Sequence, residues 1–154
     1  MNNKIKELFM RIPYGVKVMA PGWDDDVNEE ITIISEVYEL CTDGYLRLKE
    51  DETGDQYYID DVKLCLRPLS ALTEKEKREL LNRLFTDEHM NKFTVLDKGV
   101  VQEIEHESST KNFEVLYPTF DPKQCSIYVD FLYDHQIDFS GLIESGDAVD
   151  ISKI

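Results

Sequence analysis

The sequence contains few of the residues on which catalytic and metal sites are usually built. It has three His and three Cys, and the cysteines Cys41, Cys65 and Cys125 form no C-x-x-C pair. Neither an H-E-x-x-H nor a G-x-S-x-G motif occurs, so metalloprotease and hydrolase activities lack support. An odd number of widely spaced cysteines indicates reduced thiols rather than a disulfide framework. We therefore expect a cytoplasmic protein that binds no cofactor or metal.

Long apolar runs are also missing. The longest span a few residues, such as Ile31–Ile34, whereas a transmembrane helix needs roughly 20. The opening MNNKIKELFMRIP has a charged or polar residue every few positions and lacks the apolar segment of a signal peptide. We expect no membrane association.

Positive charge is scarce. The chain has 17 Lys and Arg against 32 Asp and Glu, which gives a net charge of −15. Residues 24–61 carry fourteen of the acidic residues against Arg47 and Lys49, a net charge of −12 for this segment. A field of this sign repels phosphate backbones, so we expect no direct binding of nucleic acid, whereas a basic protein partner is favoured. A plainer interpretation is that the acidity only keeps the protein soluble.

Residues 1–68 predict a small antiparallel β-barrel that resembles an SH3-like module. A helix is expected over Asn3–Arg11, ended by Gly15 and the proline that precedes it. Short strands rich in β-branched residues follow at 15–20, 30–40, 45–49 and 61–67. Asp43-Gly44 is a strong hairpin signal between two of these strands. The alternation of apolar residues slips at Ile33–Ile34, which a β-bulge would explain.

Residues 69–154 complete an α+β chain, either as a second domain or as a continuation of the first. Thr73 and Glu76 form a capping box, and the helix that follows has one apolar stripe, made of Leu80, Leu81, Leu84 and Phe85. After this helix we expect a hairpin over 93–104, a strand over 113–117 and a helix over 125–137. A helix over 100–107 is an alternative to the second strand of the hairpin. The closing GLIESG predicts one helical turn capped by Ser140.

Gly141 and Gly146 have the G-x-x-x-x-G spacing of a phosphate-binding loop. Such a loop needs Lys and then Ser or Thr after its second glycine, to neutralise phosphate and hold magnesium. Those two positions hold Asp147 and Ala148, which supply a repelling charge and no hydroxyl. The glycines are better explained by turns into and out of a short helix.

Two metal-binding motifs are incomplete. The stretch DETGDQYYIDDV, residues 51–62, has Gln56 where a calcium loop requires Gly and Val62 where it requires Glu. The pair Glu103-x-x-His106 occurs once, whereas carboxylate-bridged di-iron sites need it twice. Neither motif predicts a metal site.

An alternative function is that of an enzyme or small-ligand binder whose site is assembled from residues distant in the sequence. Cys125, His106 and His135 are the candidates, because a thiol nucleophile needs a neighbouring base. Cys65 lies between two leucines on an expected strand and Cys41 precedes a turn, so neither has the surroundings of an activated thiol. His135, on the apolar side of its expected helix, is more typical of a core histidine.

Aromatic residues beside the acidic segment favour a non-enzymatic interaction module. Trp and Tyr are enriched in protein interfaces, and the −12 segment would speed docking on a basic partner. We predict that the interface consists of Trp23, Asp24, Asp25, Asp26 and Tyr58. A lid over the core is the alternative role for the tryptophan. In its most specific form, the hypothesis is that the surface mimics nucleic-acid charge and occupies a DNA-binding protein.

Two segments support a resemblance to known proteins. VKLCLRPLSALTEKEK (62–77) resembles the LRP-(L/M)-S-(S/A)-(L/M)-T-E-E stretch of uncharacterised small proteins from bacterial and prophage genomes. DFLYDHQIDFSGLIESGDA (130–148) is similar to their C-terminal WL…HHFDYRGLIEKGLA tail. Asp147 stands where that tail has leucine, and Gln136-Ile137 where it has His-Phe. The resemblance implies cytoplasmic residence and an origin in a mobile element, and it assigns no catalytic residue.

Overall fold

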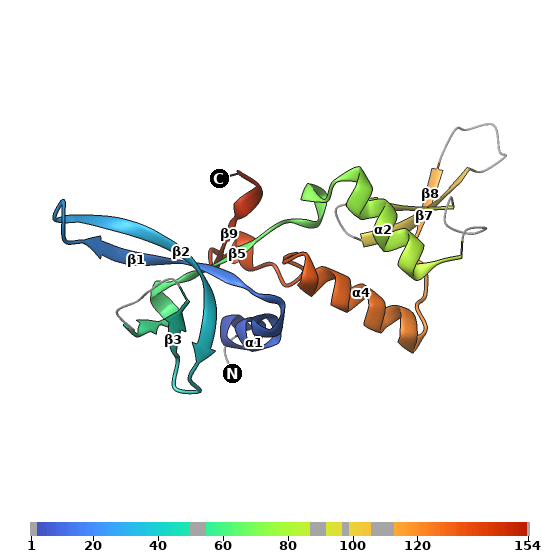
Figure 1. Ribbon diagram of the computed structural model, residues 1–154. Coiled ribbons are helices and arrows are strands. Elements are labelled where there is room, and N and C mark those ends of the chain that lie inside the picture. Colours follow the sequence, from blue (N-terminus) through green and yellow to red (C-terminus); the bar gives the residue numbers. More distant parts are fainter. Residues whose placement is uncertain (1–2, 50–54, 87–91, 97–98, 106–112, 154) are drawn as a thin grey trace. The chain divides into compact units, whose positions relative to one another are not determined.

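The protein is α+β, as the sequence predicts, and it forms two compact units (Figure 1). The computed structural model describes residues 3–49, 55–86, 92–96, 99–105 and 113–153. The first unit consists of Met1–Arg67 together with Tyr133–Ile154, and the second consists of Pro68–Leu132. Both ends of the chain therefore belong to the first unit.

The first unit begins with the helix α1 (Asn3–Arg11), whose bounds agree with those predicted. A turn of 3₁₀ helix at Ile12–Tyr14 follows and ends at Gly15, which has a φ of 73°. This left-handed conformation is one that glycine adopts without steric cost, so the chain can turn from the helix directly into the sheet.

A curled six-stranded sheet forms the rest of the first unit, and its order is β4-β3-β2-β1-β5-β9 (Figure 1). All neighbouring strands are antiparallel except β5 and β9, which are parallel. The strands are β1 (Lys17–Asp24), β2 (Glu29–Leu40), β3 (Tyr45–Leu48), β4 (Tyr57–Tyr58), β5 (Lys63–Leu66) and β9 (Ala148–Asp150). The last of these was not predicted, because no local signal ties it to β5.

The register of the β1–β2 hairpin is regular from Lys17 opposite Glu36 to Asp24 opposite Glu29. The irregularity in β2 lies instead between Val37 and Glu39, where this strand pairs with β3. The bulge predicted at Ile33–Ile34 is therefore wrong. Successive strand residues face opposite sides, and this hairpin carries isoleucine on both of its faces.

The core of the first unit is built from alternate strand residues and the inner side of α1. The buried apolar side chains are those of Leu8, Val16, Val18, Ala20, Val37, Leu46, Leu48, Ile59, Val62, Leu64, Leu66, Leu142 and Ala148. Those in β1, β3 and β5 follow the alternation that the sequence predicts.

Arg11, at the end of α1, is fully buried and connects this helix to the returning C-terminal segment. Its Nε donates to Glu7 Oε2 at 2.9 Å, and its Nη2 donates to the carbonyl oxygen of Ile137 at 2.7 Å. The guanidinium carbon lies 5.0 Å from the ring centre of Tyr133 and 5.3 Å from that of Phe139. The charge is thus paired, hydrogen-bonded and flanked by aromatic rings, the conditions under which a buried cation is tolerated.

Asp138 determines how the C-terminal segment turns into the short helix α5 (Leu142–Ser145). Its Oδ1 accepts from the backbone N–H of Leu142 at 3.0 Å, and its Oδ2 accepts from that of Ile143 at 2.8 Å. The prediction that Ser140 caps this turn is wrong, because its hydroxyl donates to Glu7 Oε1 at 2.8 Å instead. A carboxylate has two oxygens and can satisfy two of the free N–H groups at once.

The second unit contains α2 (Glu74–Leu84), a sheet of order β6-β7-β8, and most of α4 (Pro122–Asp134). The capping box is confirmed, since Thr73 Oγ1 and Glu76 Oε1 each accept the other residue's backbone N–H at 3.1 Å. The three strands are β6 (Phe93–Leu96), β7 (Gly99–Glu105) and β8 (Phe113–Leu116). The hairpin is therefore confirmed. The alternative of a helix over 100–107 is wrong for residues 100–105, which belong to β7, and residues 106 and 107 lie outside the described part of the chain.

Replacing Arg11 by Met keeps most of the packing of its stem but leaves the Glu7 carboxylate buried without its cationic partner. We expect the free energy of unfolding to fall by about 3–5 kcal/mol, which is typical when one member of a buried pair is removed. Urea denaturation of the purified protein measures this change.

The matched control is Lys49→Met, which breaks the 2.9 Å pair of Lys49 with Glu36 on the surface. Its expected cost is below about 1 kcal/mol, because solvent screens an exposed pair. The double variant Glu7→Gln, Arg11→Met should lose less free energy of unfolding than the sum of the losses in the single variants Glu7→Gln and Arg11→Met. Equal losses for Arg11→Met and Lys49→Met would contradict the special role of Arg11.

Candidate functional site

The β1–β2 hairpin extends past the other strands of its sheet (Figure 1). On one side β3 ends at Leu48, opposite Val37, although β2 continues to Glu29. On the other side β1 pairs with β5 only through Val18 and Met19. Among the described residues, the outer half of the hairpin is therefore a two-stranded ribbon that carries apolar side chains outside the core.

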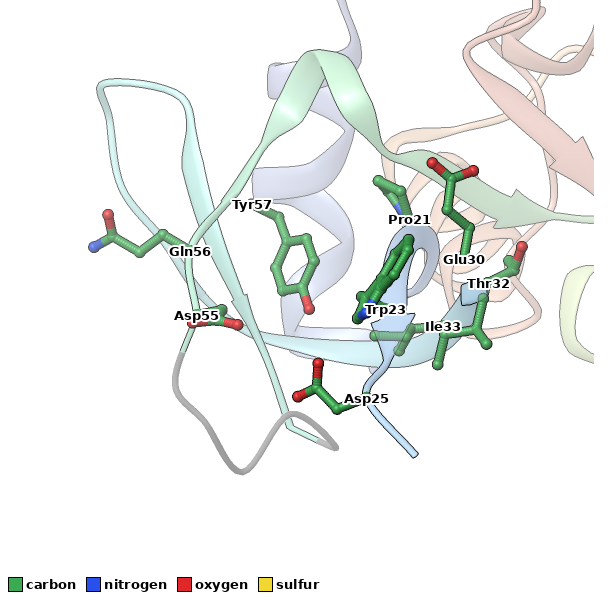
Figure 2. A pocket seen from close by; sticks show the side chains of 11 residues that line it. Pro21, Trp23, Asp25, Glu30, Thr32, Ile33, Asp55, Gln56 and Tyr57 are labelled. Atoms are coloured by element: carbon green, nitrogen blue, oxygen red, sulfur yellow. The ribbon is translucent and has the colours of Figure 1, made fainter. Parts of the chain in front are cut away.

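An open pocket of about 900 Å³ lies between this outer half and the segment that leads into β4 (Figure 2). Its lining consists of Pro21, Gly22, Trp23, Asp25, Glu30, Ile31, Thr32, Ile33, Asp55, Gln56 and Tyr57. Figure 2 shows the rings of Trp23 and Tyr57 in this lining together with the carboxylates of Asp25 and Asp55. The pocket thus combines aromatic surface with negative charge.

The apolar part of the lining continues the core face of the hairpin. Residues that are directly opposite in an antiparallel pair share a face, so Ile31 lies on the face of Gly22 and Ile33 on that of Ala20. A Cβ on Gly22 would lie 2.5 Å from Ile33 Cδ1, which shows that the side chain of Ile33, although this residue pairs with Ala20, extends over the glycine. The absence of a side chain at Gly22 therefore lets Ile33 approach the backbone of β1.

Trp23 lies on the opposite face of the hairpin, paired with Glu30, and its side chain is 52% exposed. This position excludes the alternative role of a lid over the core. Asp25, Glu30 and Asp55 place three carboxylates around the pocket, and no Lys or Arg is among its lining residues in the described part of the chain. An exposed indole beside unneutralised carboxylates is a surface that suits a cationic group.

The two other aspartates of the predicted interface lie at the tip of the hairpin. Asp24 ends β1, and its Oδ1 accepts the backbone N–H of Asp26 at 2.9 Å. Both flank the pocket-lining Asp25 in the chain. The carboxylates of this tip therefore add to the negative field at the pocket, and no Lys or Arg among the described lining residues neutralises them.

Tyr58, the fifth residue predicted for the interface, is 54% exposed and does not line the pocket. Its hydroxyl is 2.6 Å from that of Tyr45, and the two ring centres are 4.4 Å apart. The hydrogen bond to Tyr58 raises the pKa of the Tyr45 hydroxyl. The preceding residue, Tyr57, supplies the pocket's tyrosine instead, since alternate residues on a strand face opposite sides.

The interface predicted from the sequence therefore includes Trp23 and Asp25 of the pocket lining but none of its other residues. Ile31 and Ile33 belong to the strand expected over 30–40, for which the sequence predicts no functional role. The run of isoleucines in ITII was a usable signal, because it places apolar side chains on both faces of a strand. Nothing in the local sequence indicates that Tyr57 and the hairpin are neighbours in space.

The residues of the alternative, assembled site are not brought together by any contact among the described residues. Cys125 is exposed in the first turn of α4, and its sulfur lies 3.8 Å from the carbonyl oxygen of Phe120. His135 follows the end of the same helix, with Nδ1 4.0 Å from Asp134 Oδ2. His106 lies outside the described residues. This site stays a prediction.

Two motifs of the sequence remain, the pair of glycines and the possible calcium loop. Gly141 and Gly146 have φ values of 75° and 88° and flank the single turn of α5, which is the role that the sequence suggested. Of the acids in the possible calcium loop, Asp51 and Glu52 lie outside the described residues, whereas Asp55 lines the pocket and Asp60 and Asp61 lie in a 3₁₀ turn. In the part that is described, no group of three or more His, Cys, Asp or Glu is placed to hold a metal ion.

No helix in the described ranges is long and apolar enough to cross a membrane. Comparisons with protein-family models, with curated proteins and with solved structures find no match to this chain. The site must therefore be interpreted from its own geometry and charge.

Two of the three thiols, those of Cys65 and Cys125, should differ sharply in reactivity. Cys65 is 2% exposed, and burial raises the pKa of its thiol from 9.0 to about 11, whereas Cys125 is exposed. At pH 8 we expect a disulfide reagent to modify Cys125 in the folded protein and Cys65 only after unfolding. Peptide mapping by mass spectrometry identifies the modified residue, and rapid labelling of Cys65 would contradict its burial.

The same pKa shift predicts a dependence of stability on pH. Because the folded-state pKa of Cys65 is above its unfolded value of 9.0, this thiol stabilises the fold fully below pH 9. The contribution is lost as the pH rises through 9 toward about 11. Urea denaturation between these pH values should show a steeper loss for the natural protein than for Cys65→Val, which lacks the titrating group. Parallel curves would contradict the shift.

Proposed function

We propose that this protein is a non-enzymatic interaction module that binds a basic protein partner at the outer half of the β1–β2 hairpin. The observation that carries this proposal is the open pocket in which Trp23, Ile33 and Tyr57 are bordered by the carboxylates of Asp25 and Glu30. A pocket that offers aromatic and aliphatic surface inside an acidic rim suits a segment with both apolar and cationic side chains.

Charge and exposed apolar surface have separate roles in this proposal. The carboxylates near the tip attract a basic partner over a distance, which raises the association rate and makes it sensitive to salt. Trp23 supplies the area that is removed from water once the partner has docked, and large aromatic side chains dominate interface energies. A net charge of −15 also opposes direct binding of nucleic acid.

The finer expectations from the sequence belong to the same proposal. We propose a cytoplasmic protein of prophage or mobile-element origin whose curled sheet is a small barrel of SH3-like kind. In the most specific form, its acidic tip imitates the charge of nucleic acid and occupies the binding surface of a DNA-binding protein. Asp24, Asp25 and Asp26 would then stand in for backbone phosphates.

A capture experiment with charge variants tests the proposed site. Tagged protein is incubated with a lysate of the source cells at low salt and washed with increasing salt, and the variant replaces Asp24, Asp25 and Asp26 by Asn. We expect a basic protein that the natural chain retains to be lost from this variant at lower salt, because three attracting charges are gone.

The control removes the same number of charges elsewhere, through Glu74→Gln, Asp134→Asn and Glu144→Gln, all of which are exposed. Retention by this control should match that of the natural protein. Trp23→Ala should weaken binding of the purified partner by roughly 30-fold or more, the range of an interface hot spot. Equal salt elution from the natural chain and the Asp24–Asp26 variant would refute this site.

A further inference from the structure

We propose that the partner segment binds in an extended conformation and adds as a strand to the free edge of β2, along Glu30–Ile34. This inference rests on the proposed function and specifies how the partner is held. Strand addition would supply backbone hydrogen bonds for affinity, while the pocket selects side chains.

The backbone hydrogen bonds show which groups of β2 face this edge. Val37 N–H donates to Val16 O at 3.0 Å, so the odd-numbered residues of this regular hairpin direct their polar groups toward β1. Glu36 O accepts from Lys49 N–H at 2.9 Å on the other side, so the even-numbered residues direct theirs away from β1. Beyond Glu36, the next outward groups are those of Ile34, Thr32 and Glu30.

These outward groups have no strand partner in the part of the chain that the structure describes. The paired residues of β3 end at Leu48, opposite Val37, whereas β2 continues to Glu29. An unpaired strand edge of this kind is a template for another extended segment. The lining residues Glu30–Ile33 belong to the same stretch of β2, so the pocket lies where an added strand would place its side chains.

The edge of β1 on the other side of the hairpin is unsuited to the same role. Pro21 lies opposite Thr32, in a pair that does not exchange hydrogen bonds within the hairpin, so its nitrogen faces outward. A proline nitrogen carries no hydrogen, and proline on an edge strand prevents pairing. β2 contains no proline. Among the described residues, the hairpin therefore has one edge that proline blocks and one edge without a strand partner.

The occupant should alternate basic and apolar side chains. On one face of β2 the side chains of the occupant would meet Ile31 and Ile33. On the other face they would meet Glu30 and Trp23, which is paired with Glu30 in the hairpin. Lys or Arg on the second face can neutralise the carboxylate and lie against the indole. A second copy of this chain is a poor occupant, because two edges with Glu29 and Glu30 would face each other in a protein of net charge −15.

The test uses the full chain and the synthetic peptide KVKIRVK, which alternates basic and apolar residues. Hydrogen exchange followed by NMR should show fast exchange of the Glu30, Thr32 and Ile34 amides in the free protein. Addition of the peptide should slow exchange at these three positions. A peptide with alternate backbone nitrogens methylated on its pairing edge should bind roughly tenfold or more weakly, since two or more hydrogen bonds are lost.

A matched pair of variants tests the edge from the side of the protein. Thr32→Pro removes an N–H that faces outward and leaves the bonds to β1 intact, whereas Thr32→Ala keeps that N–H and removes the side chain. We expect roughly a tenfold loss of peptide affinity for the first and less than about twofold for the second. Retained slow exchange at Ile31 and Ile33 shows that the Thr32→Pro hairpin is folded.

Any one of four results would overturn the proposed addition of a basic strand. If Asp25→Asn with Glu30→Gln weakens binding while Thr32→Pro and peptide methylation leave it unchanged, the acidic docking site stands and the strand mode is wrong. If none of these changes affects binding, the proposed function fails together with the inference. If the peptide does not bind, or if the chain self-associates through the Glu30–Ile34 edge, the occupant is not a basic segment.

Discussion

The first unit depends on one buried charge, that of the Arg11 guanidinium. A buried cation is costly unless it is paired and hydrogen-bonded, so this side chain requires Glu7 beside it and the carbonyl oxygen of Ile137 in front of it. Ser140 completes the arrangement by donating to the second oxygen of Glu7. These bonds fasten the returning C-terminal segment to α1. Six residues after Leu142 the same segment pairs with β5 as the parallel strand β9.

The unequal lengths of neighbouring strands create the candidate site. β2 is twelve residues long and β3 is four, so the outer half of the hairpin leaves the support of the sheet. Ile31, at 41% exposed, and Trp23, at 52% exposed, are consequently left with large apolar areas in contact with solvent. Exposed apolar surface beside a concentration of carboxylates is more typical of a surface that binds a partner than of one that stays in contact with solvent. The proposed function and the proposed strand addition both follow from this mismatch.

Local signals predicted the secondary structure well and the connections between distant elements poorly. The bounds of α1, the capping box at Thr73 and the hairpin of the second unit depend on residues within a few positions of one another. The pairing of β9 with β5 depends on residues more than eighty positions apart. Asp138 rather than Ser140 caps α5, because the hydroxyl of Ser140 donates to Glu7. Which of several competing contacts forms depends on their relative free energies in the folded protein, and local sequence patterns do not give these free energies.

For the candidate site, composition alone determined its character: acidic, aromatic and lacking the residues of common catalytic motifs. Alternation along a strand also requires that only one of two adjacent tyrosines faces outward, and in the structure that residue is Tyr58. Only the tertiary structure decided that Tyr57 and Asp55 lie beside the hairpin, and that β3 stops where β2 continues. The physical reason is that side-chain periodicity is a property of each strand by itself, whereas a pocket and a free edge are produced by where separate strands end relative to one another.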